Sequence, residues 1–351
     1  MKHIQYYEND ISDALTHYAA ELEALQGKRI LIAGATGMIG VCLTDLLMAY
    51  SQKAKKPVYI LALARNEDKL RNRFAAYLEK ENFSYVTGDL NTGMPRIEGR
   101  VDFIIYAASN SHPVAYAKDP VGTIKTNVIG LDYILNYAAG ERLTRVVFLS
   151  SVEIYGENNL TKERFTESDC GYIDCNTLRA GYPESKRLGE ALCQAYRRGY
   201  GTDVAVARLS RVYGPTMQQE DSKVISQFLK RAVQKKDIIL KSDGKAKYSY
   251  LYVVDAATAI LTILLKGENG EAYNAADSGS ETTILELAQM VARGAGTEIV
   301  FELPEETESI GYSNVRKSLM SEEKLKRLGW KPITGLGDGI RKTIGEIRNE
   351  M

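Results

Sequence analysis

The chain lacks the features expected of a membrane protein or a nucleic-acid-binding protein. Among its 351 residues, the longest apolar candidate, Leu251 to Leu265, contains Asp255. It therefore falls short of the roughly 18 uninterrupted residues that span a bilayer. Basic and acidic residues balance at 45 each, so no global charge favours nucleic acid or an anionic membrane. Residues 1–9 are polar and lack the apolar core of a signal peptide.

The chain is also poor in cysteine, with four scattered residues, Cys42, Cys170, Cys175 and Cys193. Cys170 and Cys175 are five apart, but no second Cys/His pair accompanies them. The spacing therefore predicts no metal site. We expect reduced thiols in a cytoplasmic protein.

The apolar pattern predicts an α/β fold that follows an N-terminal helix. Within residues 1–27, apolar residues recur at steps of three and four, which is typical of an amphipathic helix that packs on the body of the protein or on a partner subunit. From residue 28, short apolar runs alternate with helical stretches, as in a parallel sheet built from βαβ units. The expected strands are Arg29–Ala33, Val58–Ala64, Phe83–Thr87, Val101–Ala107, Thr144–Ser150 and Asp203–Leu209.

After Tyr213-Gly214-Pro215 this rhythm changes, which indicates a second, smaller α/β lobe. We assign residues 28–208 to a doubly wound, Rossmann-type domain, and we expect residues 248–265 to return to its sheet. Residues 209–247 and 266–351 then form the substrate lobe. Helices are expected around Ser222–Gln234, Ala256–Leu265, Leu285–Arg293 and Glu322–Leu328.

A glycine-rich turn directly follows the first expected strand, with Gly34, Gly37 and Gly40 in the spacing G-x-x-G-x-x-G. Glycines allow a tight turn from strand to helix, close approach of a pyrophosphate and close helix–strand packing. The start of the next helix offers N–H groups to phosphate. A purely structural turn is the alternative. The predicted contacts to a dinucleotide come from Gly34, Thr36, Gly37, Met38, Ile39 and Gly40.

The end of the second strand bears on the type of cofactor. A carboxylate there would bind the ribose of NAD, whereas an arginine accommodates the 2′-phosphate of NADP. The chain reads Leu63-Ala64-Arg65-Asn66, which favours NADP over NAD. Alternatively, Arg65 is a solvated loop charge before a helix that begins near Glu67. Asp89, after the third strand, could meet an adenine amine or could belong to an ordinary turn.

A second motif, Tyr182-Pro183-Glu184-Ser185-Lys186, can handle a proton while a hydride moves. Tyr182 and Lys186 are four apart, so they share one face of a helix. Tyrosine is a weak base at its reference pKa of about 10. A nearby ammonium and the charge of the nicotinamide would lower this pKa by favouring phenolate. Ser151 ends a strand and can hydrogen-bond the reacting oxygen.

Together these residues resemble the extended short-chain dehydrogenase/reductase family, which comprises epimerases, dehydratases and decarboxylases of nucleotide sugars. The resemblance covers nearly the whole chain beyond residue 27, and 107–130 look most like UDP-glucuronate decarboxylases. It implies a homodimer, and it adds Asp89, Leu90, Ala107, Ala108 and Asn127 to the cofactor site and Ser109 to the substrate site. The matching segments are Asp89-Leu90, Ala107-Ala108-Ser109, Thr126-Asn127-Val128, Ser151-Val152-Glu153, Arg179, Arg208, Tyr213-Gly214-Pro215, Tyr252, Asp255 and Leu328-Gly329-Trp330.

The resemblance also assigns a role to Glu153, two residues after Ser151. Family members with a glutamate there include UDP-glucuronate decarboxylases and GDP-mannose-type dehydratases, whereas simple 4-epimerases usually lack it. Val152 stands where dTDP-glucose-type dehydratases carry an aspartate, which argues against their chemistry. A structural carboxylate bonded to backbone N–H groups is the alternative for Glu153.

Three departures from the family concern the substrate lobe. Arg211 replaces the usual asparagine that faces a diphosphate, and Tyr248 replaces the usual arginine. A further arginine expected near residues 308–312 is absent. Arg211 could bind phosphate through bidentate hydrogen bonds, or its presence could indicate a different substrate.

The sequence therefore predicts an enzyme that modifies a nucleotide sugar through transient oxidation to a keto-sugar, using NAD or NADP. Ser151, Glu153, Tyr182 and Lys186 are its expected catalytic residues, and Arg211 and Tyr248 its expected substrate contacts. Two alternatives remain open. One is a reductase that consumes NADPH, and the other is a dinucleotide-binding sensor without catalysis.

Overall fold

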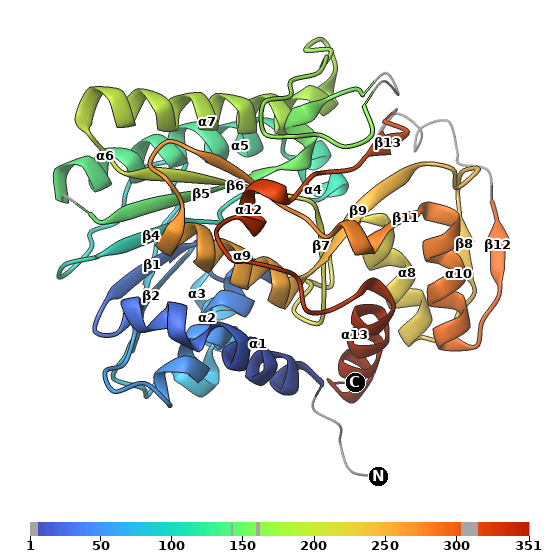
Figure 1. Ribbon diagram of the computed structural model, residues 1–351, viewed down its shortest axis with the longest axis horizontal. Helices are drawn as coiled ribbons and strands as arrows, with labels where there is room; N and C mark the ends of the chain where they lie inside the picture. The colour runs from blue at the N-terminus through green and yellow to red at the C-terminus, as the bar shows by residue number, and fades with distance from the viewer. Residues whose placement is uncertain (1–5, 142, 159–161, 303–314, 351) are drawn as a thin grey trace.

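A computed structural model of the chain describes residues 6–141, 143–158, 162–302 and 315–350. Its centre is a seven-stranded sheet in the order β10-β6-β5-β4-β1-β2-β3, in which every pair of neighbours is parallel (Figure 1). This confirms the predicted doubly wound α/β fold. The strands are β1 Arg29–Ala33, β2 Tyr59–Ala64, β3 Phe83–Thr87, β4 Phe103–Tyr106, β5 Arg145–Ser151, β6 Val204–Leu209 and β10 Ala272–Ala275.

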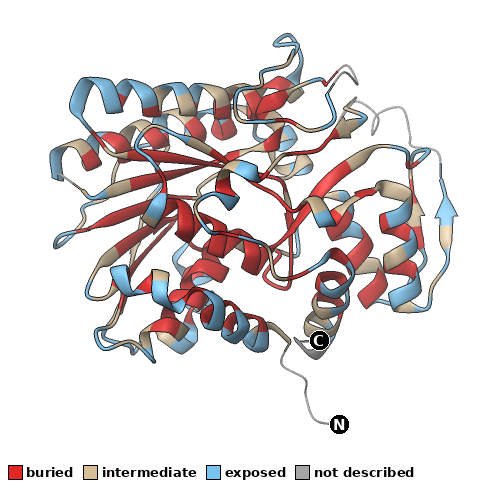
Figure 2. Cartoon of the chain, in the orientation of Figure 1, coloured by how far each residue is buried: buried red, intermediate tan, exposed pale blue. Residues whose placement is uncertain are grey.

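Helices cover both faces of this sheet, and the strands between them are buried (Figure 2). One face carries α2 Met38–Ser51, α3 Glu67–Arg73 and α9 Val253–Lys266, and the other carries α5 Pro120–Lys125, α6 Leu131–Glu141 and α7 Gly181–Tyr200. The strand order reverses between β1 and β4. In open α/β sheets, ligands bind at such a switch point, outside the carboxyl ends of the strands.

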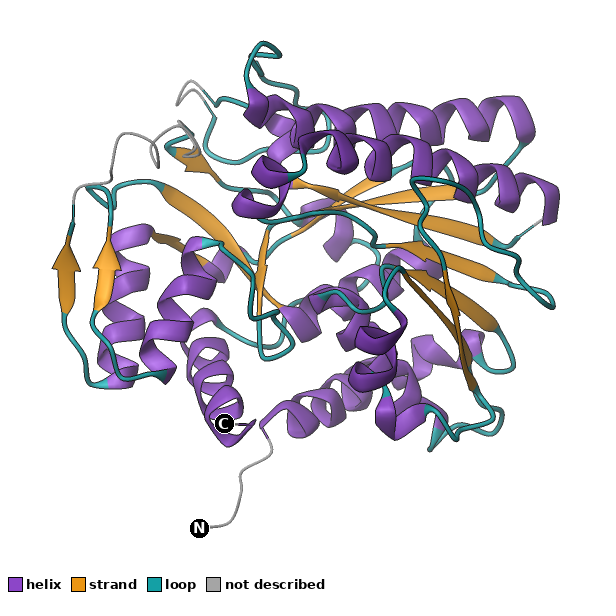
Figure 3. Cartoon of the chain, turned by 180° about the vertical axis from the view of Figure 1, so that it is seen from behind, coloured by secondary structure: helices purple, strands orange, loops and turns teal. Residues whose placement is uncertain are grey.

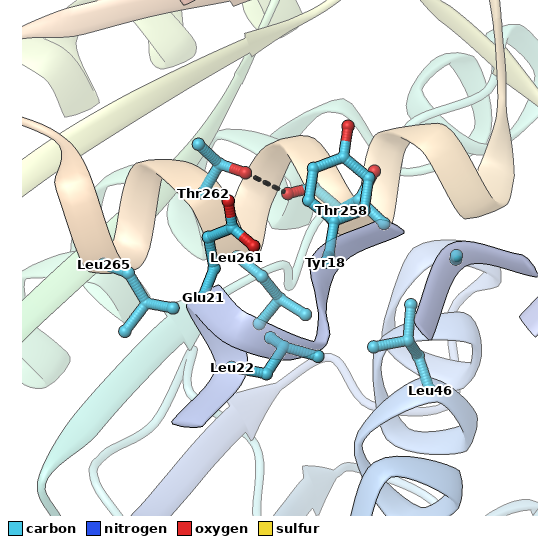
Figure 4. A pocket seen from close by; sticks show the side chains of 9 residues that line it. Tyr18, Glu21, Leu22, Leu46, Thr258, Leu261, Thr262 and Leu265 are labelled. Atoms are coloured by element: carbon cyan, nitrogen blue, oxygen red, sulfur yellow. Dashed lines mark hydrogen bonds between the residues drawn. The ribbon is translucent and has the colours of Figure 1, made fainter. Parts of the chain in front are cut away.

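The N-terminal helix α1, Tyr6–Leu22, packs on the body of the protein rather than projecting from it. Its Tyr18 hydroxyl donates to the Lys331 carbonyl at 2.6 Å. Figure 4 shows Tyr18 and Leu22 facing Leu261 of α9. The cavity between these helices measures about 10 Å³, at the lower limit for one water molecule, so it is a packing gap and not a ligand site.

A second group of strands and helices, which corresponds to the smaller lobe predicted from the sequence, lies at one end of the main sheet, as the view from behind in Figure 3 shows. Glu153 lies two residues after the end of β5, and its carboxylate lies 3.7 Å from the Arg211 guanidinium of this second group. The second group therefore lies at the carboxyl end of the strands. None of the helices in the described ranges is both long and apolar enough to cross a membrane. The elements of the lobe are β7 Arg211–Tyr213, β9 Lys247–Tyr252, β11 Glu281–Thr283, β13 Lys317–Ser318, the pair β8 Ile238–Leu240 and β12 Ile299–Phe301, and the helices α8 Val224–Val233, α10 Ile284–Ala295, α12 Glu323–Lys326 and α13 Leu336–Glu350.

The segment 248–265 differs in part from the prediction that it returns to the main sheet. Its strand, β9, pairs with β7, β11 and β13, and only its helix, α9, packs on the main sheet. The edge beside β6 is instead filled by β10, within the range assigned to the smaller lobe. Because β10 has only four residues, including Asn274, it lacks a strong strand pattern. The division into two lobes stays a proposal.

Candidate active site

The glycine turn links β1 to α2 at the switch point of the sheet. Gly34 has a φ of +82°, and a Cβ atom there would lie 2.7 Å from the backbone of Ala108. A Cβ atom on Gly40 would lie 2.6 Å from the carbonyl oxygens of Gly34 and Ala35. Real Cβ atoms do not approach other atoms this closely. Packing against Ala108 therefore requires glycine at position 34, and packing within the turn requires it at position 40.

Gly37 has a different role, because little in the chain requires glycine there. A Cβ atom would meet only the Gly34 carbonyl oxygen, at 3.3 Å. Gly37 is the N-cap of α2, and no side chain caps this helix, so N–H groups at its start, near Met38 and Ile39, are available to an anion. The turn therefore fits the pyrophosphate of a dinucleotide.

The ends of β2 and β3 border the same crevice. Arg65 is exposed and forms no hydrogen bond or ion pair within the described ranges, whereas the next residue, Asn66, caps α3 by accepting from the Lys69 N–H at 2.8 Å. Asp89 is exposed, and its carboxylate accepts the Asn91 N–H at 2.9 Å, as in an ordinary turn. Leu90, in contrast, is buried.

Two buried polar atoms near this crevice lack protein partners among the residues described. One is the hydroxyl of Ser109, a residue in the loop after β4, and the other is the side-chain oxygen of Asn127. The Asn127 amide also donates to the Ser185 hydroxyl at 2.9 Å, and Ser185 in turn donates to the Tyr182 carbonyl at 2.8 Å. Asn127 lies in a single π-helical turn, residues Thr126–Gly130, of the kind that often occurs at functional sites. Buried polar atoms without partners are rare, so both atoms are candidates for ligand contacts.

The three predicted proton-handling residues come together where β5 ends beside α7. Ser151 is the last residue of β5, and both Tyr182 and Lys186 are buried on α7. The Lys186 ammonium donates to the Leu149 carbonyl at 2.8 Å and lies 5.9 Å from the centre of the Tyr182 ring. The helix and the strand thus place a phenol, an ammonium and a hydroxyl around one small region.

Burial governs the pKa values of both buried groups. It raises the pKa of Tyr182 well above the usual range, although a hydrogen bond with the Ser151 side chain opposes this shift. Burial also lowers the pKa of Lys186 to about 7. The lowering of the Tyr182 pKa by the ammonium and the nicotinamide charge together stays a prediction for the protein with its cofactor bound.

Glu153 lies between two arginines. Its carboxylate is 2.8 Å from the Arg179 guanidinium and 3.7 Å from that of Arg211. The Arg211 guanidinium also stacks on the Tyr248 ring, 3.8 Å from its centre. All three charged residues line a pocket of about 300 Å³ that also includes Tyr172. The Glu153 carboxylate is therefore held by arginine side chains and not by backbone N–H groups, as the structural alternative would require. The backbone N–H of Glu153 donates separately to the Ser151 hydroxyl.

Sequence reasoning missed Tyr116, which lies on α4, Pro113–Lys118. Its ring stacks on Tyr182 with centres 5.4 Å apart and planes 19° from parallel. Burial raises the pKa of its hydroxyl, while the charge of Arg179 lowers this pKa and that of Glu153 raises it. Nothing in the spacing of Tyr116 could have indicated this contact, since α4 and α7 are distant in the sequence.

Several landmarks that matched the family serve to hold the structure together. Arg208 forms an ion pair with Glu190 at 2.7 Å, and Glu190 accepts from the Ser150 hydroxyl at 2.5 Å, next to Ser151. Asp255 accepts two N–H groups from the segment before α13. The Trp330 indole donates to Thr258 at 3.0 Å. The region near 308–312, where an arginine was expected, lies outside the described residues.

The fold and the site define an NAD(P)-dependent enzyme of the extended short-chain dehydrogenase/reductase type. Residues 30–276 match the NAD dependent epimerase/dehydratase family, and the chain belongs to this family. This confirms the resemblance seen in the sequence.

The relatives also confirm the likeness to UDP-glucuronate decarboxylases. UDP-glucuronic acid decarboxylase 1 of Xenopus tropicalis is 30% identical over 330 residues, which span 92% of this chain and 73% of the relative. UDP-glucuronic acid decarboxylase 6 of Arabidopsis thaliana is 30% identical over 89% of this chain and 86% of its own length. Among solved structures, the dTDP-glucose 4,6-dehydratase DesIV of Streptomyces venezuelae, with NAD bound, is 25% identical with a TM-score of 0.77, covering 92% and 97% of the two chains.

Proposed function

We propose that this chain modifies a nucleotide-activated sugar by oxidising it transiently to a keto-sugar, with no net consumption of cofactor. One observation carries the proposal. The Ser151, Tyr182 and Lys186 group lies beside a pocket that holds Glu153 between two arginines. The names of the relatives support the substrate class, since they are decarboxylases and dehydratases of UDP- and dTDP-linked sugars.

In this proposal the proton and the hydride leave the sugar together. Tyr182 accepts the proton of a sugar hydroxyl, taken to be at C4, while Ser151 hydrogen-bonds the same oxygen. The Lys186 ammonium favours the phenolate that Tyr182 must become. The glycine turn and Asn127 would hold a nicotinamide dinucleotide, and the chemistry that this group would supply is reversible uptake of the hydride.

The resulting ketone acidifies C5, or it labilises a carboxylate at C6. Glu153 then serves as a base or orients the reacting group. Arg179 and Arg211 hold its carboxylate in place. Val152, which is buried, stands where the dTDP-glucose-type dehydratases carry an aspartate, so we favour decarboxylation or another route over their chemistry.

A panel of nucleotide sugars tests this function. The purified enzyme is incubated with UDP-glucuronate, dTDP-glucose or UDP-glucose and an oxidised dinucleotide, and products are identified by mass spectrometry. We expect one sugar to be converted without a lasting change in the dinucleotide. Conversion only of a ketone, with loss of one NADPH per product, would instead establish the reductase. Dinucleotide binding with no conversion of any compound would favour the sensor.

We propose NADP as the preferred cofactor, on the strength of Arg65, although NAD is the dinucleotide bound in DesIV. Arg65→Ala should weaken NADP binding about tenfold, because an exposed charge-assisted contact to the 2′-phosphate is lost, and it should leave NAD binding unchanged. Titration calorimetry with both dinucleotides measures this. The control is Arg71→Ala, since Arg71 lies on α3, the helix that follows Arg65, and donates to the Tyr85 hydroxyl. Equal losses for NAD and NADP would show that Arg65 does not bind the phosphate.

We propose that Arg211 anchors the diphosphate of the substrate. Arg211→Ala should raise the KM for the nucleotide sugar at least tenfold, because a half-buried guanidinium provides strong bonds to phosphate. Tyr248→Ala should raise the KM less, since Tyr248 supports Arg211 through ring stacking. Steady-state kinetics compare the two variants. Should nucleoside diphosphates fail to bind even the unchanged protein, the substrate is of another kind.

The homodimer and the cytoplasmic location stay proposals. Exposed apolar side chains on α5 and α7, Val121, Ile124 and Leu188, support a contact between copies, and the mass of the protein in solution tests it. The four free thiols support a reducing compartment, which localisation of a tagged chain would check.

A further inference from the structure

A segment of the smaller lobe, residues 214–222, reaches the glycine turn, and we call it the strap. It connects β7 to α8. The Thr216 hydroxyl donates to the Met38 carbonyl at 2.9 Å, and the Gln218 amide donates to the Thr36 carbonyl at 2.8 Å. The strap therefore binds the backbone of the same turn that fits the pyrophosphate.

The same segment is also tied to α3, which begins at the ribose end of the crevice. The Lys69 ammonium donates to the Gln218 side-chain oxygen at 3.1 Å, and the Arg73 guanidinium donates to the Thr216 carbonyl at 2.7 Å. The Gln218 side chain thus joins the glycine turn to α3, because its amide nitrogen binds Thr36 and its amide oxygen binds Lys69. The neighbouring residue, Gln219, is exposed, and its side chain forms no hydrogen bond within the described ranges.

At its other end the strap holds the helix that covers the catalytic tyrosine. The Ser222 hydroxyl accepts the Val114 N–H at 3.0 Å and lies 3.0 Å from Nδ1 of His112. These residues form the start of α4, which carries Tyr116 onto the Tyr182 ring. One segment therefore connects the cofactor turn to the proton-handling residue.

We propose that the strap closes the dinucleotide crevice and that Gln218 is the positioning residue that keeps the dinucleotide bound throughout the cycle. This inference rests on the proposed function, because a reaction that returns its own hydride requires the reduced dinucleotide to stay in place. For the dinucleotide to leave, the Gln218 amide must release Thr36 and Lys69. Two hydrogen bonds, from the strap to the glycine turn and to α3, thus slow the release of the dinucleotide.

Gln218→Ala tests this, with Gln219→Ala as the matched control. The reduced dinucleotide is bound to each protein and displaced by excess oxidised dinucleotide, and its fluorescence is followed by stopped flow. We expect dissociation about tenfold faster for Gln218→Ala, because one neutral and one charge-assisted hydrogen bond are lost, and no change for Gln219→Ala. Gln218→Glu, which keeps the acceptor for Lys69 but cannot donate to Thr36, should fall between them. Thermal unfolding without dinucleotide verifies that every variant folds, and its midpoint should be slightly lower for Gln218→Ala because the same two bonds are lost there.

The experiment distinguishes an error in the proposed role of the strap from an error in the proposed function. If the unchanged protein binds no nicotinamide dinucleotide, the function itself is wrong. If it binds one and all variants release it at the same rate, the function stands and the role of Gln218 is overturned. Faster release by Gln219→Ala to the same extent would also overturn it, since the effect would then be general to the segment.

Discussion

Tyr182→Phe is expected to lower turnover about a thousandfold and to leave dinucleotide binding nearly unchanged. The substitution removes the phenol oxygen and keeps the ring that stacks on Tyr116. Only the proton-transfer step should therefore be lost. Lys186 cannot replace the phenol, because its ammonium already donates to the Leu149 carbonyl and lies over the ring.

The measurement compares kcat and the dinucleotide dissociation constant for Tyr182→Phe and for Tyr172→Phe. Tyr172 lines the same pocket but is 63% exposed, so loss of its hydroxyl should cost little. Normal turnover by Tyr182→Phe on the true substrate would remove Tyr182 from the mechanism. A large loss of dinucleotide binding would instead mean that the hydroxyl supports the cofactor.

Glu153→Gln is expected to separate the first hydride transfer from the step that follows it. The amide keeps the shape of the side chain, and its oxygen can still accept from Arg179, but it is no longer a base. The first oxidation should therefore proceed, whereas product formation should fall about a hundredfold or more. Reduced dinucleotide should accumulate and be visible by its absorbance.

Glu157→Gln is the control, because Glu157 is an exposed carboxylate that lines the same pocket. Both variants receive the same chemical change, so an effect confined to Glu153 reports its position between Arg179 and Arg211. If Glu153→Gln turns over normally and no reduced dinucleotide builds up, Glu153 is structural. The simple epimerase and the net reductase would then become the better explanations.

The part of this protein that could be predicted from sequence rests on local patterns. The run Arg29–Ala33 is an apolar strand followed at once by glycines, and Gly40 is required by contacts within the turn itself. Tyr182 and Lys186 could be paired because one helix carries both. Such patterns predicted the main sheet, the turn and the proton-handling residues.

The rest depends on contacts between distant segments. The stacking of Tyr116 on Tyr182 and the bond from Gln218 to Thr36 join elements that no spacing rule connects. The strong effect of burial on the Tyr182 pKa could not be predicted for the same reason, because it depends on how deeply the start of α7 is buried. β10 was missed because its place is set by the open edge beside β6 and not by its own short sequence.

The return of the hydride is tested most directly with UDP-glucuronate deuterated at C4, the probe that the relatives suggest. The enzyme is given this sugar and a catalytic amount of oxidised dinucleotide, and the position of the deuterium is determined by nuclear magnetic resonance. We predict many turnovers per dinucleotide, with the deuterium retained in the product sugar. Product that forms only with one dinucleotide changed per turnover, or deuterium recovered in the dinucleotide pool, would contradict transient oxidation.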